Sequence, residues 1–316
     1  MKHILFIDPI DKLNIKKDSS LMLATTMKRS GVEVYLLFEK DFYLNNKKSP
    51  EFVLYDFASE FYEDGYYLKS FELQTSSLMS VSNVDIIHMR IDPPFDTRYL
   101  RYLWMLRYYQ EKGIRIVNSP DGILKFNEKL HAYTQESSLA SFVGSSSEEF
   151  LKFTSQMLKE NHQELILKPL DLFQGIGVEK ISLNRKDLKE KFELKIKDNN
   201  GPVVAQPFCQ EVTRGEIRSL YFKGIELGSI LKVPKKGEFL ANIAQGANFH
   251  AITLSSKVKK ECDRICSELL LEGIDWVAFD IMGDHISEIN ITCPGLLVEV
   301  SFAHKKNLAD EILKLI

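Results

Sequence analysis

Short apolar runs alternate with longer amphipathic segments through residues 1–118. The runs are rich in β-branched and aromatic residues and predict buried strands, whereas the longer segments carry apolar residues at helical spacing. Alternation of this kind predicts a parallel sheet covered by helices. We expect strands at 3–8, 32–38, 85–90 and 114–118, a helix at 97–113, and a helix at 19–31 that is capped by Ser19 or Ser20.

The pattern changes after residue 118. The stretch at 118–130 is expected to be a hinge, and the lysine-rich module that follows ends where "DNNGP" at 198–202 breaks the periodicity. Strands at antiparallel spacing come next. The fold class is therefore α/β, and we expect a parallel-sheet domain at 1–120, a small α+β domain at 121–201 and an antiparallel-sheet domain at 202–316. The later helices are expected at 147–161, 185–196, 256–272 and 307–316, and the later strands at 164–169, 178–183, 203–208, 216–222 and 225–233.

Composition narrows the class of protein. The chain has 316 residues, 44% apolar and 27% charged, which is typical of a globular protein with two or three modules. A net charge of −3 gives no reason to expect nucleic acid or a membrane surface as partner. The four cysteines form no CxxC motif, and Cys262 and Cys266, four residues apart on a predicted helix, are expected to face the core. No apolar run approaches the roughly 20 residues that span a bilayer. We expect a reducing, cytoplasmic compartment.

The loop after the first strand is unusually polar. Residues 8–20, "DPIDKLNIKKDSS", and residues 89–96, "MRIDPPFD", both follow predicted strands of the parallel sheet. Ligands of such sheets bind beyond the carboxyl ends of the strands, so these charges favour a ligand site. For Lys16 and Lys17, a solvated pair that caps the strand remains an alternative.

The hairpin at 277–292 carries candidate metal ligands. Glu288 and Asn290 are two residues apart in a strand and share a face. A strict two-residue turn at Gly283–Asp284 places Asp280 on the other face, whereas a three-residue loop or one bulge places it opposite Glu288. The second geometry gathers three oxygen ligands that suit Mg²⁺ held jointly with phosphates. A solvated strand face is the alternative.

A lysine and a glycine loop form the second candidate. Lys168 ends a predicted strand, and Gly175 and Gly177 would let backbone N–H groups approach an anion. An ordinary hairpin loop explains the same residues. Lys129, in "NEKL", taken alone is a surface lysine. A nicotinamide-dependent oxidoreductase is disfavoured because no GxGxxG follows the first strand.

The order of these pieces carries more information than any one of them. The series "DPI…NIKKDSS", "MRIDPPFD", "VNSP", "NEKL", "ILKPLD", "VAQPF", "GEIR", "FDIMGD" and "EINIT" is collinear with the ATP-grasp superfamily. Within that superfamily the chain resembles the bacterial glutathione synthetases over essentially its whole length. The resemblance implies an ATP-grasp fold with an N-terminal parallel-sheet domain, a small α+β lid and an antiparallel-sheet C-terminal domain.

The resemblance also implies roles for individual residues. ATP and Mg²⁺ (or Mn²⁺) are the implied cofactors, and Lys168 and Arg218 are the implied catalytic residues. The implied nucleotide-binding residues are Lys129, Lys168, Gly175, Gly177, Gln206, Pro207, Phe208, Cys209 and Glu216; the implied metal ligands are Asp280, Glu288 and Asn290; and the implied substrate-binding residues are Asn14, Lys17, Asp18, Ser20, Arg90, Asp92, Lys232 and Asn242.

The implied reaction joins γ-glutamylcysteine to glycine. ATP would convert the carboxylate into an acyl phosphate, and a lid at about 125–200 would exclude water from it. ADP and phosphate would be released. A homo-oligomer, dimer or tetramer, is also implied.

Several positions depart from the family pattern. Leu172 and Gln174 stand where the family usually has glycine, and Leu240 and Asn248 each replace an arginine. Lys232 also replaces an arginine, and Gly295 and Val298 replace a hydroxyl and an arginine. The acceptor side has thus lost positive charge. Three hypotheses follow: a glutathione synthetase with a rearranged glycine site, a ligase that uses a less anionic amine, and an ATP-binding sensor without ligase activity.

Overall fold

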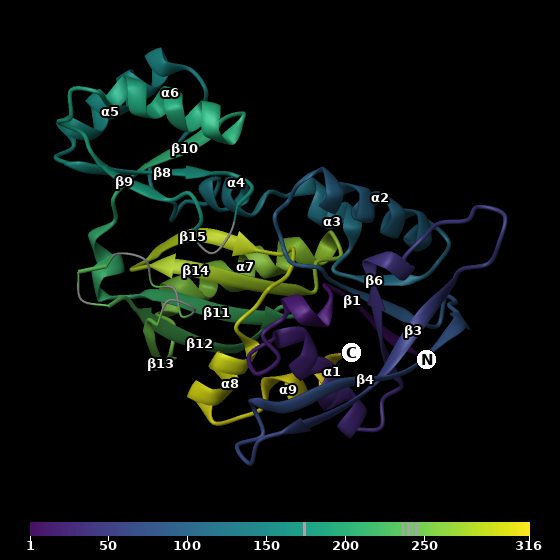
Figure 1. Ribbon diagram of the computed structural model, residues 1–316. Helices are drawn as coiled ribbons and strands as arrows, with labels where there is room; N and C mark the ends of the chain where they lie inside the picture. Colours follow the sequence, from purple (N-terminus) through teal and green to yellow (C-terminus); the bar gives the residue numbers. More distant parts are fainter. Residues whose placement is uncertain (173–174, 236, 239–240, 242, 244–245) are drawn as a thin grey trace.

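The computed structural model describes residues 1–316 except 173–174, 236, 239–240, 242 and 244–245. Three sheets follow one another along the chain, and the termini lie close together on the body of the molecule (Figure 1). The expected α/β class is confirmed, with one sheet that contains parallel strands and two sheets that are antiparallel.

The first sheet has the strand order β4-β3-β2-β1-β5-β6. Strands β2, β1, β5 and β6 pair in parallel, as expected. An antiparallel hairpin extends the other edge and was not predicted, because its strands are half exposed and rich in Ser and Glu. The elements are β1 (His3–Ile7), η1 (Ile10–Lys12), α1 (Ser19–Arg29), β2 (Val34–Phe38), η2 (Glu39–Asp41), β3 (Glu51–Phe61), β4 (Leu68–Ser80), β5 (Ile86–Arg90), α2 (Thr97–Glu111) and β6 (Arg115–Val117).

The cap of helix α1 corrects a prediction. Asp18, not Ser19 or Ser20, is the N-cap, and its carboxylate accepts a hydrogen bond of 2.8 Å from Leu21 N. Asp and Ser cap helices about equally well, so the sequence alone cannot choose between them. The two serine hydroxyls make longer-range contacts instead, described below.

The second sheet, β7-β10-β8-β9, is antiparallel throughout. Helices α5 and α6 cover one face around Phe150 and Phe192, whose rings stack at 4.0 Å between centroids. Strand β10 pairs with β8, so this sheet extends past the predicted domain boundary at residue 201. The elements of this part are α3 (Pro120–Lys125), α4 (Glu128–Tyr133), β7 (Phe142–Gly144), α5 (Ser147–Lys159), β8 (Glu164–Pro169), β9 (Glu179–Ser182), α6 (Leu188–Asn199) and β10 (Val203–Pro207).

The third sheet, β13-β12-β11-β14-β15, is also antiparallel. Its elements are η3 (Gln210–Arg214), β11 (Glu216–Phe222), β12 (Ile225–Val233), β13 (Asn248–Ile252), α7 (Ser256–Leu271), β14 (Trp276–Met282), β15 (His285–Asn290), α8 (Leu297–His304) and α9 (Leu308–Leu315). Cys262 and Cys266 on α7 are buried, as expected. None of the described helices is long and apolar enough to cross a membrane.

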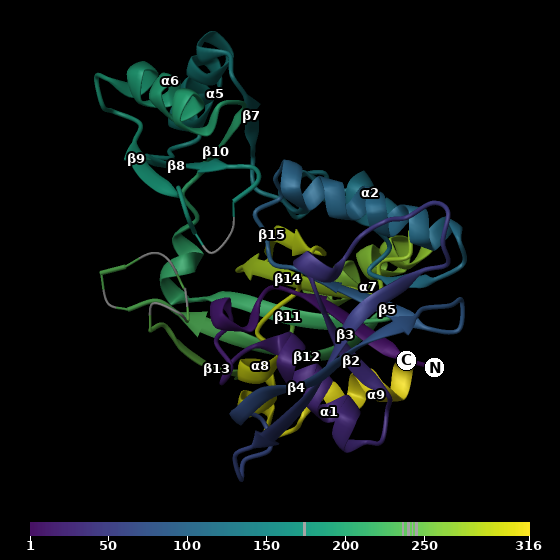
Figure 2. The ribbon, with the colours of Figure 1, turned by 45° about the vertical axis from the view of Figure 1, so that its right-hand side comes forward.

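The first and third sheets share their hydrophobic cores, whereas the second has a core of its own. Asn118 fastens the two large sheets together: its amide nitrogen donates to Trp276 O (2.7 Å) and Ile291 O (2.8 Å), and its oxygen accepts from Trp276 N (2.8 Å). The lobe of α5, α6 and the second sheet therefore stands off from the body (Figure 2). Three domains at 1–120, 121–201 and 202–316 remain our proposal, with β10 moved to the central one.

Candidate active site

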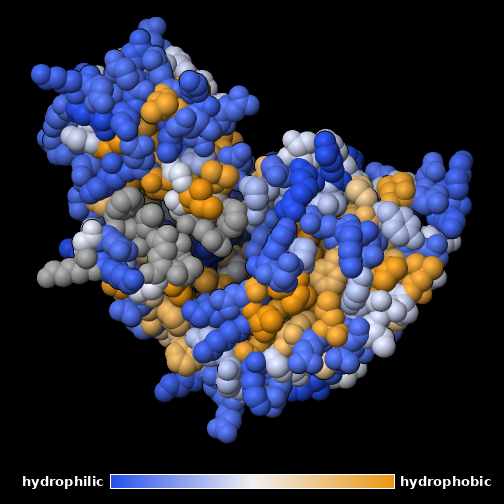
Figure 3. Space-filling view, in the orientation of Figure 1, coloured by the Kyte–Doolittle hydropathy of each residue, from blue (hydrophilic) through white to orange (hydrophobic). Residues whose placement is uncertain are grey.

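A cavity of about 570 Å³ lies where the three sheets meet. The space-filling view shows the surface hollowed between the small lobe and the body (Figure 3). Every described residue that the sequence predicted for the site lines this cavity, except Gly177; Asn242 lies outside the described residues. Gly177 sits at φ +72° in the loop, where an added Cβ would come within 3.2 Å of Pro169. Its role is therefore in the turn rather than in the cavity wall.

The register of the β14–β15 hairpin decides where Asp280 lies. Asp280 pairs with Glu288 and Met282 pairs with His285, with a register shift after Asp280. The bulged alternative is thus the correct one, and Gly283 at φ +60° makes the turn. Asp280, Glu288 and Asn290 all line the same cavity.

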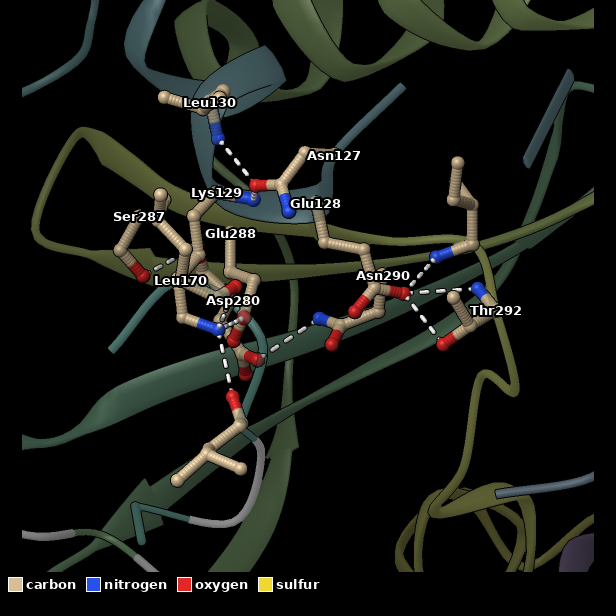
Figure 4. A network of polar contacts seen from close by, with 12 residues as sticks. Asn127, Glu128, Lys129, Leu130, Leu170, Asp280, Ser287, Glu288, Asn290 and Thr292 are labelled. Carbon is tan, nitrogen blue, oxygen red and sulfur yellow. Dashed lines mark hydrogen bonds and ion pairs between the residues drawn. The ribbon is translucent and has the colours of Figure 1, made fainter. Parts of the chain in front are cut away.

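Each of the two carboxylates is paired with a cation, and Figure 4 shows the pair that Glu288 makes with Lys129. Asp280 contacts Lys232 Nζ at 2.9 Å and Arg218 Nη2 at 3.0 Å. Burial alone would raise the pKa of Asp280, but the Arg218 and Lys232 charges outweigh it and lower that pKa. Glu288 Oε1 lies 2.9 Å from Lys129 Nζ. The anionic form of Asp280 is therefore stable in the folded protein.

The donor chemistry fits Mg²⁺ shared with phosphates. Asn290 donates its amide hydrogens to Asp280 Oδ2 (3.1 Å) and Ala278 O (3.2 Å), which leaves its oxygen as the atom available to a cation. Two carboxylates and an amide oxygen are the hard ligands that Mg²⁺ prefers. The described residues include no group of three or more His, Cys, Asp and Glu that could hold a metal unaided. A metal here would need further oxygen ligands from a substrate.

Helix α4 fastens Lys129 beside the metal ligands. Asn127 caps the helix by accepting from Lys129 N (3.1 Å) and Leu130 N (3.0 Å). Lys129 Nζ also donates to Leu170 O (3.3 Å) and Leu172 O (2.8 Å), in the loop after β8 (Figure 4). Lys129 is only 7% exposed, so the interpretation of a surface lysine is wrong.

Glu128 is a site residue that sequence reasoning missed. Its Oε1 accepts from Ile291 N (2.7 Å), Thr292 N (2.8 Å) and Thr292 Oγ1 (2.8 Å). These bonds hold the start of α4 against the end of β15. The only clue in the sequence was the position of Glu128 beside Lys129 in "NEKL". That position does not reveal the contact with Ile291, which lies 163 residues further along the chain.

Lys168 is the last residue but one of β8 and lines the cavity from the side of the lobe. Burial lowers its pKa to about 8, and the nearby negative charge of Glu288 opposes the shift. Its ammonium lies 5.5 Å from the centre of the Tyr133 ring. A lysine in such a position is kept charged by a bound anion.

The strand that leaves the lobe supplies the opposite wall. Gln206, Pro207, Phe208 and Cys209 line the cavity at the end of β10, and Gln206 Nε2 donates to Ser141 Oγ at 2.7 Å. Phe208 N donates to Glu164 O at 2.9 Å. The wall therefore combines apolar side chains with backbone groups, which suits a flat heteroaromatic ring.

The N-terminal loop forms the far end of the cavity. Arg90 Nε donates to Ser20 Oγ and Arg90 Nη2 to Pro294 O, both at 2.9 Å, and its guanidinium lies 4.2 Å from the centre of the Trp276 ring. Burial, together with the charge of Asp92, raises the pKa of Asp18 to about 6. Burial also raises the pKa of Asp92.

Comparison with known proteins agrees with this geometry. Residues 1–123 match the family model described as "Prokaryotic glutathione synthetase, N-terminal domain", and residues 128–305 match the one described as "Prokaryotic glutathione synthetase, ATP-grasp domain". The chain belongs to the prokaryotic glutathione synthetase family. It is therefore an ATP-grasp ligase that forms carbon–nitrogen bonds.

Relatives of this family member match nearly end to end. The "Glutathione synthetase" of Vibrio parahaemolyticus is 30% identical over 311 residues, 97% of this chain and 95% of that protein. The "Glutathione synthetase" of Prochlorococcus marinus is 28% identical over 315 residues, 99% of this chain and 98% of that protein. The expected resemblance is confirmed.

Solved structures share the fold at low identity. D-cycloserine synthetase DcsG has a TM-score of 0.66 at 13% identity and covers 99% of both chains. The ATP-grasp ligase PsnB, solved with its minimal precursor, Mg and ADP, has a TM-score of 0.58 at 15% identity and covers 98% of this chain and 97% of that one.

Of the positions that depart from the family pattern, Gly295 and Val298 have different surroundings in the structure. Gly295 lines the cavity, but Val298 is fully buried in the core under α8 and does not. Lys232 is held by Glu216 at 2.6 Å and by Asp280. Leu240 and Gln174 lie outside the described residues. Glu299, which follows Val298 on α8, lines the cavity and was not predicted.

Proposed function

We propose that this protein is a glutathione synthetase that joins γ-glutamylcysteine to glycine, with ATP converted to ADP and phosphate. One observation supports the proposal above others: a single cavity collects the lysines and oxygen ligands suited to a metal–nucleotide and the polar N-terminal loop suited to a zwitterionic peptide. The relatives named glutathione synthetase, at 28–30% identity, support the same reaction.

In this proposal the phosphates of ATP lie between Lys129 and Lys168, and the adenine lies against the Gln206–Cys209 strand. Mg²⁺, when bound by Asp280, Glu288 and Asn290, neutralises charge on the transferring phosphoryl group. The lysine ammonium groups orient the phosphates in line with the carboxylate of γ-glutamylcysteine. The chain thus contributes positioning and charge rather than a covalent step.

Arg218 is suited to the second half of the reaction. It lies beside Asp280, 14% exposed in its side chain, so one face of the guanidinium is anchored. We propose that it holds the acyl phosphate and the oxyanion that forms when the amine attacks. The lobe above the cavity excludes water, which would otherwise hydrolyse the acyl phosphate.

A second candidate is a ligase for a less anionic amine. Lys232 is ion-paired with Glu216 and Asp280, and Val298 lies in the core, so neither offers a cation to the carboxylate of glycine. A carboxylate that loses one charged partner binds far less tightly. The complete set of oxygen ligands disfavours the third hypothesis, a sensor without ligase activity.

The test is a turnover assay on the full chain with ATP, Mg²⁺ and γ-glutamylcysteine. ADP release and the product mass are followed with glycine and then with other small amines. The proposal predicts glycine-dependent ADP release and the mass of glutathione. A product with another amine alone would favour the second candidate. ATP binding with no ADP release for any acceptor would refute both.

A further inference from the structure

Glu299 carries an unsatisfied oxygen at the N-terminal end of the cavity. The residue lies in the first turn of α8, is 3% exposed and lines the cavity. Its Oε2 is buried and has no hydrogen-bond partner among the residues that the structure describes. A buried carboxylate oxygen without a partner is costly, so its presence in a wall of the site points to a ligand that supplies the missing donor.

The packing of α8 fixes where this oxygen lies relative to the first loop. Leu297 N donates to Ser19 Oγ at 3.0 Å, so the first turns of α8 and α1 are in contact. The charges of Lys17, Asp18 and Arg218 all act on Glu299. Glu299 therefore belongs to the same end of the cavity as the predicted peptide-binding loop.

The charges at this end are not balanced within the protein. We call Lys17, Asp18, Arg90, Asp92 and Glu299 the substrate end of the cavity. It has three carboxyl groups and two cations; Arg218 also acts on Glu299 but is already paired with Asp280. The Arg90 guanidinium is engaged with Ser20 Oγ, Pro294 O and the Trp276 ring. Burial raises the pKa of each of the three carboxyl groups. An added cation would stabilise their charged forms.

We propose that Glu299 binds the ammonium group of the γ-glutamyl substrate, with Lys17 placed for the neighbouring carboxylate. A primary ammonium has three donors and a full positive charge, which matches an unpartnered oxygen in a carboxyl-rich end. The α-ammonium and α-carboxylate of a γ-glutamyl group are joined through one carbon, so opposite charges side by side are what such a ligand requires. This inference rests on the proposed function.

The test compares two ligands that differ only in that ammonium. Binding of γ-glutamylcysteine and of glutaryl-cysteine, which lacks the amino group, is measured by calorimetry with Mg²⁺ and a non-hydrolysable ATP analogue. We expect the unaltered protein to prefer γ-glutamylcysteine at least tenfold, and Glu299→Gln to reduce that preference to twofold or less. Glu299→Asp keeps the charge and should keep part of the preference. Glu311→Gln, on α9 and outside the cavity, is the matched control.

The outcomes separate the inference from the function on which it rests. A Glu299→Gln variant that folds and keeps the full preference would overturn the ammonium site while leaving the proposed function intact. Failure of the unaltered protein to bind γ-glutamylcysteine at all would overturn the proposed function. If Glu299→Gln fails to fold, the inference is tested by the Glu299→Asp variant and by the unaltered protein. An unaltered protein that binds both ligands equally well would refute the inference.

Discussion

The two ends of the cavity treat charge differently. At one end, which we call the metal end, acidic and basic side chains form ion pairs at 2.6–3.0 Å. The substrate end has three carboxyl groups for two cations, and Glu299 Oε2 has no hydrogen-bond partner among the described residues; at the metal end Arg218 Nε is also buried without one, but its guanidinium is ion-paired with Asp280. The metal end consists of Lys129, Glu216, Arg218, Lys232, Asp280 and Glu288.

This difference indicates which kind of ligand each end of the cavity binds. Where protein cations already neutralise the carboxylates, a metal and phosphates can enter as an exchange of partners, with lysines moving from carboxylate to phosphate. Where carboxyl groups lack partners, the ligand must bring the charge itself. The predictions below test this contrast, from the largest expected effect to the smallest.

Removing the metal ligands should abolish turnover. In the double variant Asp280→Asn with Glu288→Gln we expect Mg²⁺-dependent ADP release to fall by roughly 10³-fold or more, since charge stabilisation by a metal contributes several kcal/mol to such reactions. Steady-state kinetics gives the result, with Asp284→Asn in the exposed hairpin turn as control. Unchanged rates in the double variant would refute the metal assignment.

The single variant Asp280→Asn should also weaken the fold. It leaves Lys232 and Arg218 next to each other with one charged partner fewer, and loss of one member of a buried ion pair costs about 3–5 kcal/mol. Because the folded-state pKa of Asp280 is lowered, its contribution is present above the unfolded pKa and is lost as pH falls. Urea unfolding at pH 7 and pH 4 measures both effects. Equal stability at pH 7 would contradict the pairing.

Glu128 should act by position rather than by charge. Glu128→Ala removes the acceptor of three hydrogen bonds, and we expect kcat to fall by roughly 10–100-fold, as for other residues that orient metal ligands. Glu128→Gln keeps the acceptor oxygen and should recover most of that loss. The Mg²⁺ affinity, measured separately, should follow the same order. Equal defects in both variants would instead assign the effect to the charge.

The lowered pKa of Lys168 predicts that the affinity for ATP falls at high pH. With a folded-state pKa of about 8, the ammonium is lost as pH rises through 8, and the affinity for ATP should fall by about tenfold between pH 7.5 and 9.5. Lys168→Arg stays charged and should show a much smaller change. Fluorescence or calorimetric titration at each pH provides the measurement. Parallel pH profiles for the two proteins would exclude Lys168 as the origin.

Asp18→Asn should stabilise the free protein, the reverse of Asp280→Asn. Burial raises the pKa of Asp18 to about 6, so its stabilising contribution is complete below the unfolded pKa and is lost as pH rises through 6. Asn removes the charge and still caps α1. We expect a gain of about 1 kcal/mol in unfolding free energy at pH 8, shrinking towards zero near pH 4. A loss at pH 8 would contradict the unbalanced charge at the substrate end.

The sequence predicted the fold where burial leaves a strong pattern. Strands β1 and β5 are buried along their whole length and carry short apolar runs, so they were found. Strand β4 has only a few buried side chains, such as Leu68 and Phe71, and the rest is polar and exposed. Periodicity carries too little information there, and the β3–β4 hairpin was missed.

The site residues that the sequence predicted are likewise those that a local pattern marks. Asp280, Glu288 and Asn290 could be grouped from strand periodicity plus a bulge, which is a local property. Glu128 and Glu299 act through partners far along the chain, at Thr292 and beside the first loop, and no local pattern encodes such contacts. Val298 shows the opposite error, since a position in a motif turned out to face the core.

The central claim is that this cavity activates a carboxylate by phosphoryl transfer. The most direct measurement uses γ-glutamylcysteine labelled with ¹⁸O at both oxygens of its cysteine carboxylate, with ATP, Mg²⁺ and glycine. Transfer through an acyl phosphate predicts one ¹⁸O atom in each phosphate released, detected by mass spectrometry. Phosphate without the label, alongside product formation, would contradict the account.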